Sequence, residues 1–482
     1  MIAIVCTLLS AAGFWFSLGL GSQWWLVWLA PVLWFAFGDS KPWVAFLASR
    51  GAFALGMSNM LRAYAGILPA PAVALGPVVP GLLFTLAVLG ARRVRPALEP
   101  VAAALAFAAL WTGFDLLLSL LSSPGSIGSP ATGELGAPAL VQSAALVWFC
   151  GVTFLIGAVA AGRALGLRTR SAPPVILALA LFTANAAFGY WRLSAPAAAH
   201  ERVALIDSDD TVGPHRRPDG PAELAAVDAD AVQIAKLKGR HVRLVVLPEN
   251  ISRIDPQWLG AAQARLAAAA DAADATVVAS FASFAKLVDG APRNVAWAFR
   301  LGAAPPTADG KRHLIPVVES SVFKPGPVVL PDGTGLEICL DMDFQRMIRH
   351  DEQHTRPRLL AVPAWDFGAD GWVHARDALL RSVESGVPKA RTVRDGLMRL
   401  NDRFGRVVAE ARAVAGFTTL VGELPLAGRG GATLYDRIGD LFGWLCLALG
   451  LGAVGASWWR GARPRSEDSR PGTHTRASGA PA

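Results

Sequence analysis

Long apolar runs dominate the first 200 residues and return shortly before the C-terminus. A helix needs roughly 20 apolar residues to cross a hydrocarbon core of about 30 Å, and eight runs approach or reach that length. The predicted spans are 2–20, 23–38, 43–62, 70–90, 98–121, 139–161, 173–192 and 438–458. Because run 2–20 lacks a basic leader and a second run follows at once, we expect a retained helix rather than a signal peptide.

The pattern changes between the seventh and eighth spans, where short β-rich runs alternate with Ala-rich helical stretches. The predicted strands are 203–206, 242–247, 275–280, 295–300, 336–339 and 359–362. The predicted helices are 221–238, 257–272 and 371–385. Apolar strands separated by helices indicate an α/β fold whose sheet is buried on both faces.

These patterns predict that the chain is divided into four parts. Residues 1–192 form an N-terminal transmembrane domain of seven helices, and 193–437 form one water-soluble α/β domain. Residues 438–459 form a last transmembrane helix. The tail 460–482 is rich in Arg, Ser, Gly and Pro, a composition typical of disorder.

Composition and charge support a membrane protein. The 482 residues are 53% hydrophobic and 17% charged, against about 25% charged in ordinary soluble chains. The net charge of +8 comes with Arg clusters at 92–95, 163–170 and 460–465, beside apolar spans. This placement indicates membrane topology rather than nucleic-acid binding. By the positive-inside rule, both termini lie in the cytoplasm and 193–437 lies outside it, which in a bacterium means an inner-membrane protein with a periplasmic domain.

Three segments of the α/β domain place reactive side chains beside short apolar runs. Glu249 follows the run 244–248, Lys311 precedes the run 314–316, and Cys339 ends the run 336–338. The other three cysteines lie in apolar spans, so a disulfide within the domain and a metal site built on clustered Cys are both excluded. A thiol becomes a strong nucleophile when a base takes its proton and a cation stabilises the negative charge. We therefore predict that Glu249 is the base, Lys311 the stabilising cation and Cys339 the nucleophile.

At these residues the chain resembles the nitrilase (carbon–nitrogen hydrolase) superfamily, and in particular its membrane branch, the apolipoprotein N-acyltransferases. The matching motifs are Pro248-Glu249, Lys311-x-His313-Leu314-x-Pro316-x-x-Glu319, Ile338-Cys339, the helix and turn at 372–388 (WVHARDALLRSVESGVP), the hairpin 402–406 (DRFGR) and the lead-in 433–440 (TLYDRIGD). The resemblance spans nearly the whole chain. It implies a four-layer αββα sandwich attached to a membrane domain of about eight transmembrane helices.

The resemblance also implies an activity. Cys339 would take an acyl chain from a phospholipid as a thioester and pass it to the N-terminal amine of a diacylglyceryl-cysteine lipoprotein, with no metal or organic cofactor. Glu319 and Asp341 would support the triad. Leu340, Trp365 and Trp372 would line the substrate pocket.

Two other interpretations remain open from the sequence. Where the acyltransferases have Cys-Tyr-Glu, this chain has Cys339-Leu340-Asp341, and an Asp at that position is more typical of soluble amidases of the superfamily. A membrane-anchored amidase, or an acyltransferase with a different acceptor, is therefore one alternative. A catalytically inactive membrane scaffold is the other, although the complete set of Glu, Lys and Cys argues against it.

Overall fold

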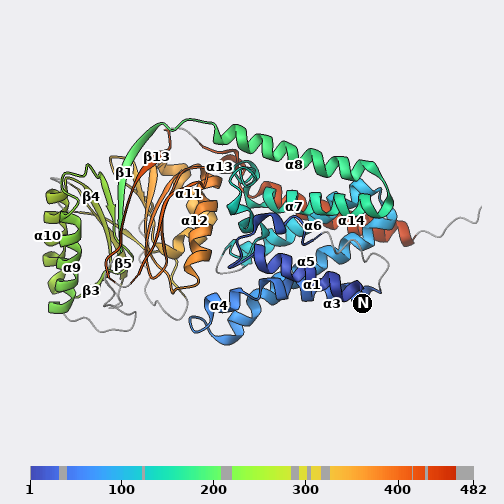
Figure 1. Ribbon diagram of the computed structural model, residues 1–482, viewed down its shortest axis with the longest axis horizontal. Coiled ribbons are helices and arrows are strands. Elements are labelled where there is room, and N and C mark those ends of the chain that lie inside the picture. Colours follow the sequence, from blue (N-terminus) through green and yellow to red (C-terminus); the bar gives the residue numbers. More distant parts are fainter. Residues whose placement is uncertain are drawn as a thin grey trace, which may run out of the picture.

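The computed structural model divides into a bundle of apolar helices and an α/β domain (Figure 1). The structure describes residues 2–31, 41–121, 125–207, 220–283, 293–300, 306–315, 326–414, 416–428 and 432–462. The predicted tail falls almost entirely outside these residues, as do part of the second predicted span and Glu319.

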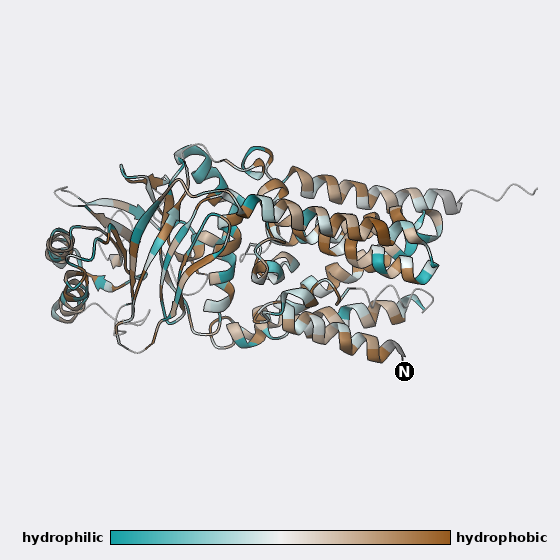
Figure 2. Cartoon of the chain, turned by 45° about the horizontal axis from the view of Figure 1, so that its top comes forward, coloured by the Kyte–Doolittle hydropathy of each residue, from teal (hydrophilic) through white to brown (hydrophobic). Residues whose placement is uncertain are grey.

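Apolar helices build the first part. Their bounds are α1 Ile2–Ser17, α3 Pro42–Met57, α4 Met60–Tyr64, α5 Ala70–Val94, α6 Pro100–Leu121, α7 Ala144–Thr169, α8 Ala172–Leu193 and, at the end of the chain, α14 Leu441–Ala462. Figure 2 shows that the hydrophobic residues gather along this bundle. Exposed Leu, Ile and Trp side chains on its outer helices, such as Leu179 and Leu449, fit a bundle that faces lipid.

Five helices in the described part of the chain are long and apolar enough to cross a membrane: Ala70–Ala97, Pro100–Leu121, Ala144–Thr169, Ala172–Leu193 and Leu441–Trp459. The layout of a helical membrane domain joined to an α/β domain is thus confirmed, but the predicted number of about eight long spans is not matched. Helices α1 and α3 each have only 16 residues. At the second predicted span, the described residues form a short 3₁₀ turn, Trp24–Leu26.

The third predicted span, 43–62, ends early because a buried polar side chain interrupts it. Helix α3 ends at Met57, and α4 starts at Met60. Between them lies Asn59, which is buried and donates hydrogen bonds from its amide to the carbonyls of Trp15 and Leu18, at 2.8 and 2.9 Å. A side chain that bonds a neighbouring segment in this way favours a turn over a continuing helix.

The α/β domain lies between α8 and α14. Its helices are α9 Gly220–Ala235, α10 Pro256–Ala273, α11 Gln345–Thr355, α12 Gly371–Ser385 and α13 Leu434–Ile438. Its strands are β1 Ala199–Ile206, β2 Leu244–Val246, β3 Ser252–Ile254, β4 Thr276–Ser283, β5 Arg293–Phe299, β6 Thr307–Gly310, β7 Val328–Val329, β8 Thr334–Leu336, β9 Leu359–Trp365, β10 Lys389–Arg394, β11 Leu397–Asn401, β12 Val407–Arg412 and β13 Thr419–Leu426.

Two mixed sheets organise these strands. Among the described residues, the first sheet has the order β13-β1-β2-β4-β5-β6, with β3 paired to β4, and the second has the order β12-β11-β10-β9-β8-β7. Strands β1, β2 and β4 run parallel, as do β8, β9 and β10, while the outer strands are antiparallel. Strand β2, whose carboxyl end precedes Glu249, and strand β9, which ends at Trp365, therefore lie in the middle of the two sheets.

Successive side chains along each strand point to opposite faces of its sheet, and this produces four layers. In β1, Val203 and Leu205 pack between the two sheets, whereas Ala204 and Ile206 pack against α9 and α10. This period of two is what a strand covered on both faces requires. Helices α11 and α12 cover the second sheet on the side of the bundle (Figure 1). The predicted αββα sandwich is confirmed.

Helix α12 also connects the two domains through polar contacts. Asp377 and Arg381 both bond the Ser126 hydroxyl, each at 2.7 Å, and Arg376 donates to the carbonyls of Thr132 and Gly133. Each of these α12 side chains is buried. The second sheet and the site at its strand ends are therefore held in a fixed position above the bundle.

Candidate functional site

Glu249 lies at the carboxyl end of β2, as the sequence predicted. Its backbone N–H donates to the carbonyl of Ala364 at 3.1 Å, which ties this strand end to the end of β9 in the second sheet. The side chain is only 2% exposed. A buried carboxylate is costly unless a charge or hydrogen bonds compensate it.

Lys311 supplies that compensation. It follows β6, where its N–H bonds the carbonyl of Asn294 at 2.9 Å. Its Nζ lies 2.7 Å from Oε1 of Glu249, and its side chain is fully buried. The structure thus brings two of the three predicted catalytic residues into a direct, buried ion pair.

Two residues that the sequence analysis did not single out orient Glu249. The amide of Asn294, on β5, donates a short hydrogen bond to Oε1 of Glu249. The Ser280 hydroxyl, on β4, bonds Oδ1 of Asn294 at 2.9 Å. In the sequence, the only sign of these two residues was a polar side chain within a largely apolar strand. The pairing of β4 with β5 was needed to connect them to Glu249.

Cys339 lies just beyond the second sheet's strand β8. The predicted strand 336–339 stops at Leu336, and Cys339 begins a 3₁₀ turn, Cys339–Asp343. Its φ is +47°, a left-handed conformation that costs energy in any residue with a Cβ and is concentrated at functional sites. Its Sγ lies 3.6 Å from the carbonyl oxygen of Trp365.

Glu249 and Cys339 both contact the carboxyl end of β9. Glu249 is anchored on Ala364, and the thiol contacts the next residue of the same strand, Trp365. Burial raises the pKa of the Cys339 thiol well above its usual value, the Glu249 carboxylate raises it further, and Lys311 opposes the rise. At neutral pH the resting residue is therefore a thiol, and an attack on substrate requires a base to remove its proton.

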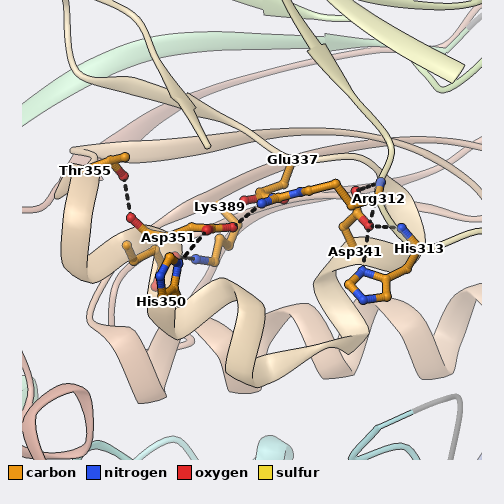
Figure 3. Close-up of polar contacts among 9 residues, drawn as sticks. Arg312, His313, Glu337, Asp341, His350, Asp351, Thr355 and Lys389 are labelled. Carbon is orange, nitrogen blue, oxygen red and sulfur yellow. Dashed lines mark hydrogen bonds and ion pairs between the residues drawn. The ribbon is translucent and has the colours of Figure 1, made fainter. Parts of the chain in front are cut away.

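Asp341 connects the Cys339 segment to the Lys311 segment. It is fully buried, and its carboxylate accepts hydrogen bonds from the backbone N–H groups of Arg312, at 3.1 and 3.2 Å, and His313, at 2.7 Å (Figure 3). The His313 ring also lies 3.1 Å from this carboxylate. Asp341 thus fixes the backbone that follows Lys311.

Arg312 strengthens the same connection. Its guanidinium bonds Glu337 and Asp351, each at 2.6 Å, and so links the segment after β6 to β8 and α11 (Figure 3). Nearby Asp309 is completely buried; burial raises its pKa to about 8, although Arg312 opposes the rise. Asp309 therefore binds its proton more readily than an ordinary carboxyl group does.

The predicted pocket residues occupy different places. Leu340 is half-buried in the turn after Cys339. Trp365 contacts the thiol through its carbonyl, and its ring stacks on Phe367 with centroids 5.8 Å apart. Trp372 lies on α12, and the guanidinium carbon of Arg376 lies 5.3 Å from the centroid of its indole ring. Substrate contacts for these three residues stay predictions, and Glu319 lies outside the described residues.

Within the residues that the structure describes, no group of three or more His, Cys, Asp or Glu side chains is arranged to hold a metal ion.

Comparison with known proteins adds an independent observation. The apolipoprotein N-acyltransferase of Geobacter metallireducens is 25% identical over 480 residues, covering 87% of this chain and 89% of that protein. That of Allorhizobium ampelinum is 26% identical, covering 82% of this chain and 79% of that protein. The chain resembles the apolipoprotein N-acyltransferases. A third protein of this name, from Vibrio vulnificus, is 28% identical, but over only 26% of this chain and 24% of its own length.

Solved structures resemble about half of the chain. An amidase from Nesterenkonia sp. AN1, in complex with butyramide, is 22% identical, covers 47% of this chain and 92% of its own, and has a TM-score of 0.39. Nit3 of Saccharomyces cerevisiae, a member of the nitrilase superfamily, is 19% identical, with coverage of 48% and 92% and a TM-score of 0.40. No family model matches the chain.

Proposed function

We propose that this protein is an apolipoprotein N-acyltransferase that transfers an acyl chain from a phospholipid, through a thioester on Cys339, to the N-terminal amine of a diacylglyceryl-cysteine lipoprotein. One observation supports the proposal: the end of β9 contacts both Glu249, which forms a buried ion pair with Lys311, and the thiol of Cys339, which has a left-handed backbone. The similarity to acyltransferases along most of the chain supports the choice of substrates.

In the first half-reaction, Glu249 takes the proton from Cys339 as Sγ attacks the ester carbonyl carbon of the phospholipid. The oxygen of the tetrahedral intermediate becomes negative, and the Lys311 ammonium stabilises it. When the carbon–oxygen ester bond breaks, Glu249 returns the proton to the leaving alkoxide, and a lysophospholipid departs. The acyl chain remains on Cys339 as a thioester.

In the second half-reaction, the lipoprotein amine attacks the thioester carbonyl. Glu249 takes a proton from the amine, Lys311 again stabilises the oxyanion, and the carbon–sulfur bond breaks. The proton on Glu249 then returns to the Cys339 sulfur. The products are an amide and the free thiol, so the enzyme is restored without any cofactor.

We also propose that the α/β domain faces the periplasm of a bacterial cell. Arg92 and Arg93 end α5, and Arg168 lies in the last turn of α7. These helix ends lie at the end of the bundle away from the α/β domain (Figure 1). By the positive-inside rule, that end is cytoplasmic.

Complementation tests the proposal. Wild-type protein should restore growth to a bacterial strain depleted of its own apolipoprotein N-acyltransferase, whereas Cys339→Ala should not. Cys6→Ala, in α1, is the matched control for loss of a cysteine and should restore growth. Immunoblots of membrane fractions must show equal amounts of all three proteins.

The same assay addresses the alternative of an amidase or a different acceptor. Asp341 resembles the residue typical of soluble amidases at this position, and its carboxylate binds the backbone that follows Lys311. If wild-type protein accumulates in membranes yet fails to restore growth, the lipoprotein acceptor is wrong and the alternative is favoured. Growth restored by Cys339→Ala would contradict the catalytic proposal itself.

A further inference from the structure

Two exposed aromatic side chains mark the level at which α8 leaves the bundle. Tyr190 and Trp191, in its last turn, are 70% and 71% exposed. Aromatic residues of this kind are enriched where a membrane protein meets the lipid headgroups. At the other end of the bundle, Trp458 and Trp459 of α14 are similarly exposed, at 63% and 70%. The α8 pair therefore indicates the bilayer surface nearest the α/β domain.

The hairpin between β11 and β12 brings arginines to the same level. Arg403 donates to the carbonyl of Pro196 at 3.2 Å, just after α8, and Arg406 donates to the carbonyl of Leu193, the last residue of α8, at 3.3 Å. Arg403 and Arg406 lie 4.6 and 5.2 Å from the ring centroid of Phe404, and Arg192 lies 5.4 Å from it.

This arginine cluster, Arg192, Arg403 and Arg406, carries more positive charge than its surroundings neutralise. Asp402 pairs with Arg406 at 2.6 Å. Over the described ranges of the chain, no carboxylate lies within ion-pair distance of Arg192 or Arg403. Three guanidinium groups thus share one close carboxylate, and crowding of like charges is favourable only when an anion compensates it.

The hairpin is held rigidly against the bundle. Gln142 donates to the carbonyl of Phe404 at 2.9 Å and accepts a hydrogen bond from Arg192 at 2.6 Å. The Arg406 side chain is nevertheless 44% exposed. The cluster is therefore fixed at one height and remains accessible from the membrane surface.

We propose that Arg403 and Arg406, together with Tyr190 and Trp191, bind the phosphate of an anionic phospholipid in the leaflet that the α/β domain faces. Guanidinium groups bind phosphate oxygens in a planar, two-bond geometry, and a basic group at a bilayer surface attracts anionic lipid. The positive-inside rule gives no reason for arginines at this end of the bundle. The hairpin follows β11, which runs antiparallel to β10, whereas β8, β9 and β10 are parallel. It therefore lies at the opposite end of the second sheet from Cys339, and the proposed surface is distinct from the catalytic site.

The test uses purified full-length protein in a neutral detergent. Its thermal unfolding is followed while phosphatidylglycerol is titrated in, with phosphatidylcholine and water-soluble glycerol phosphate as separate arms. The variants are Arg403→Gln, which breaks no carboxylate pair, and Arg403→Gln/Arg406→Gln. The matched control is Lys238→Gln/Arg240→Gln, which removes two exposed charges just after α9, in the layer farthest from the bundle.

Phosphatidylglycerol should stabilise wild type and the control at the same concentrations. Its half-maximal concentration should rise roughly fivefold for each charge removed from the cluster. The proposal is overturned if both cluster variants respond like wild type, or if the control weakens as much as they do. Equal stabilisation of wild type by glycerol phosphate would also overturn it, since that result indicates a site for soluble phosphate.

Discussion

Removing one charge of the Glu249–Lys311 pair should destabilise the protein far more than removing both. The two side chains are 2% and 0% exposed, with 2.7 Å between Oε1 and Nζ. Lys311→Met removes the cation that contacts the buried Glu249 carboxylate, and Glu249→Gln removes the carboxylate charge that faces the buried ammonium. Loss of one partner from such a pair costs about 3–5 kcal/mol, whereas replacing both with neutral side chains is often close to neutral.

The corresponding change in melting temperature can be estimated from the size of the domain. One kcal/mol shifts Tm by about 2–4 °C in a domain of this size, so each single variant should melt roughly 6–20 °C below wild type. Glu249→Gln/Lys311→Met should melt above both single variants. All three should lose most or all of the activity, because each lacks a catalytic group.

Differential scanning fluorimetry of purified protein in detergent measures these shifts. Several scan rates are needed because membrane proteins often unfold irreversibly. The control is Arg265→Met, which breaks an ion pair with Asp228 of similar length, 2.6 Å, but with side chains 36% and 55% exposed. Exposed pairs contribute less than about 1 kcal/mol. A double variant that melts below both single variants would refute the reasoning, as would Lys311→Met at the wild-type temperature.

Three further predictions concern neighbouring residues. Asn294→Ala should lower kcat by about tenfold or more with little change in KM. Asn294→Asp should raise the pKa of Glu249 and so shift the acidic limb of the pH–rate profile to higher pH. Unchanged kinetics in both variants would exclude a positioning role for Asn294. Asp341→Ala should lower stability by about 2–4 kcal/mol, seen as a fall in Tm that Asp341→Asn partly reverses. Burial lowers the pKa of His374, but Asp343 and then Asp370 raise it to about 9 overall. Because this folded-state pKa is above the unfolded value, protonated His374 should stabilise the fold fully below about pH 6.5, and that stabilisation should be lost as pH rises through 9. His374→Gln should flatten this part of the plot of stability against pH. An unaltered slope would contradict the assignment of this pH dependence to His374.

Much of the α/β domain could be predicted from apolar patterning. The predicted helix 371–385 coincides with α12, and the predicted strands all overlap observed ones. Strands such as β2 and β4 are buried on both faces and mostly apolar, which makes them easy to find. Strand β10 (KARTVR) is also buried but carries three basic residues, and it was not predicted. Helix α11 was missed because Gln345–Thr355 contains only two aliphatic side chains, Met347 and Ile348. Its amphipathic face is too narrow to detect by composition.

The candidate site was only partly predictable, for a physical reason. Glu249 and Lys311 were found because charged side chains stand out beside apolar runs. Asn294 has no such contrast, and its role depends on which strand pairs with which. The left-handed conformation of Cys339 depends on the turn after β8, because nothing in its own side chain favours φ of +47°.

The helical domain was harder to divide than the α/β domain. Hydropathy located the apolar runs, but helix ends depend on polar contacts between helices. Asn59 interrupts the third span through bonds to residues more than 40 positions away. Such long-range bonds leave no trace in a hydropathy profile.

The most direct test of the central claim is the intact mass of the purified protein after incubation with phosphatidylethanolamine. Wild type and Cys6→Ala should each gain the mass of one fatty acyl group, located on Cys339 by peptide analysis and removed by hydroxylamine. Glu249→Gln should gain it far more slowly, and Cys339→Ala should not gain it at all. Wild-type protein without the adduct, or Cys339→Ala with it, would contradict the account.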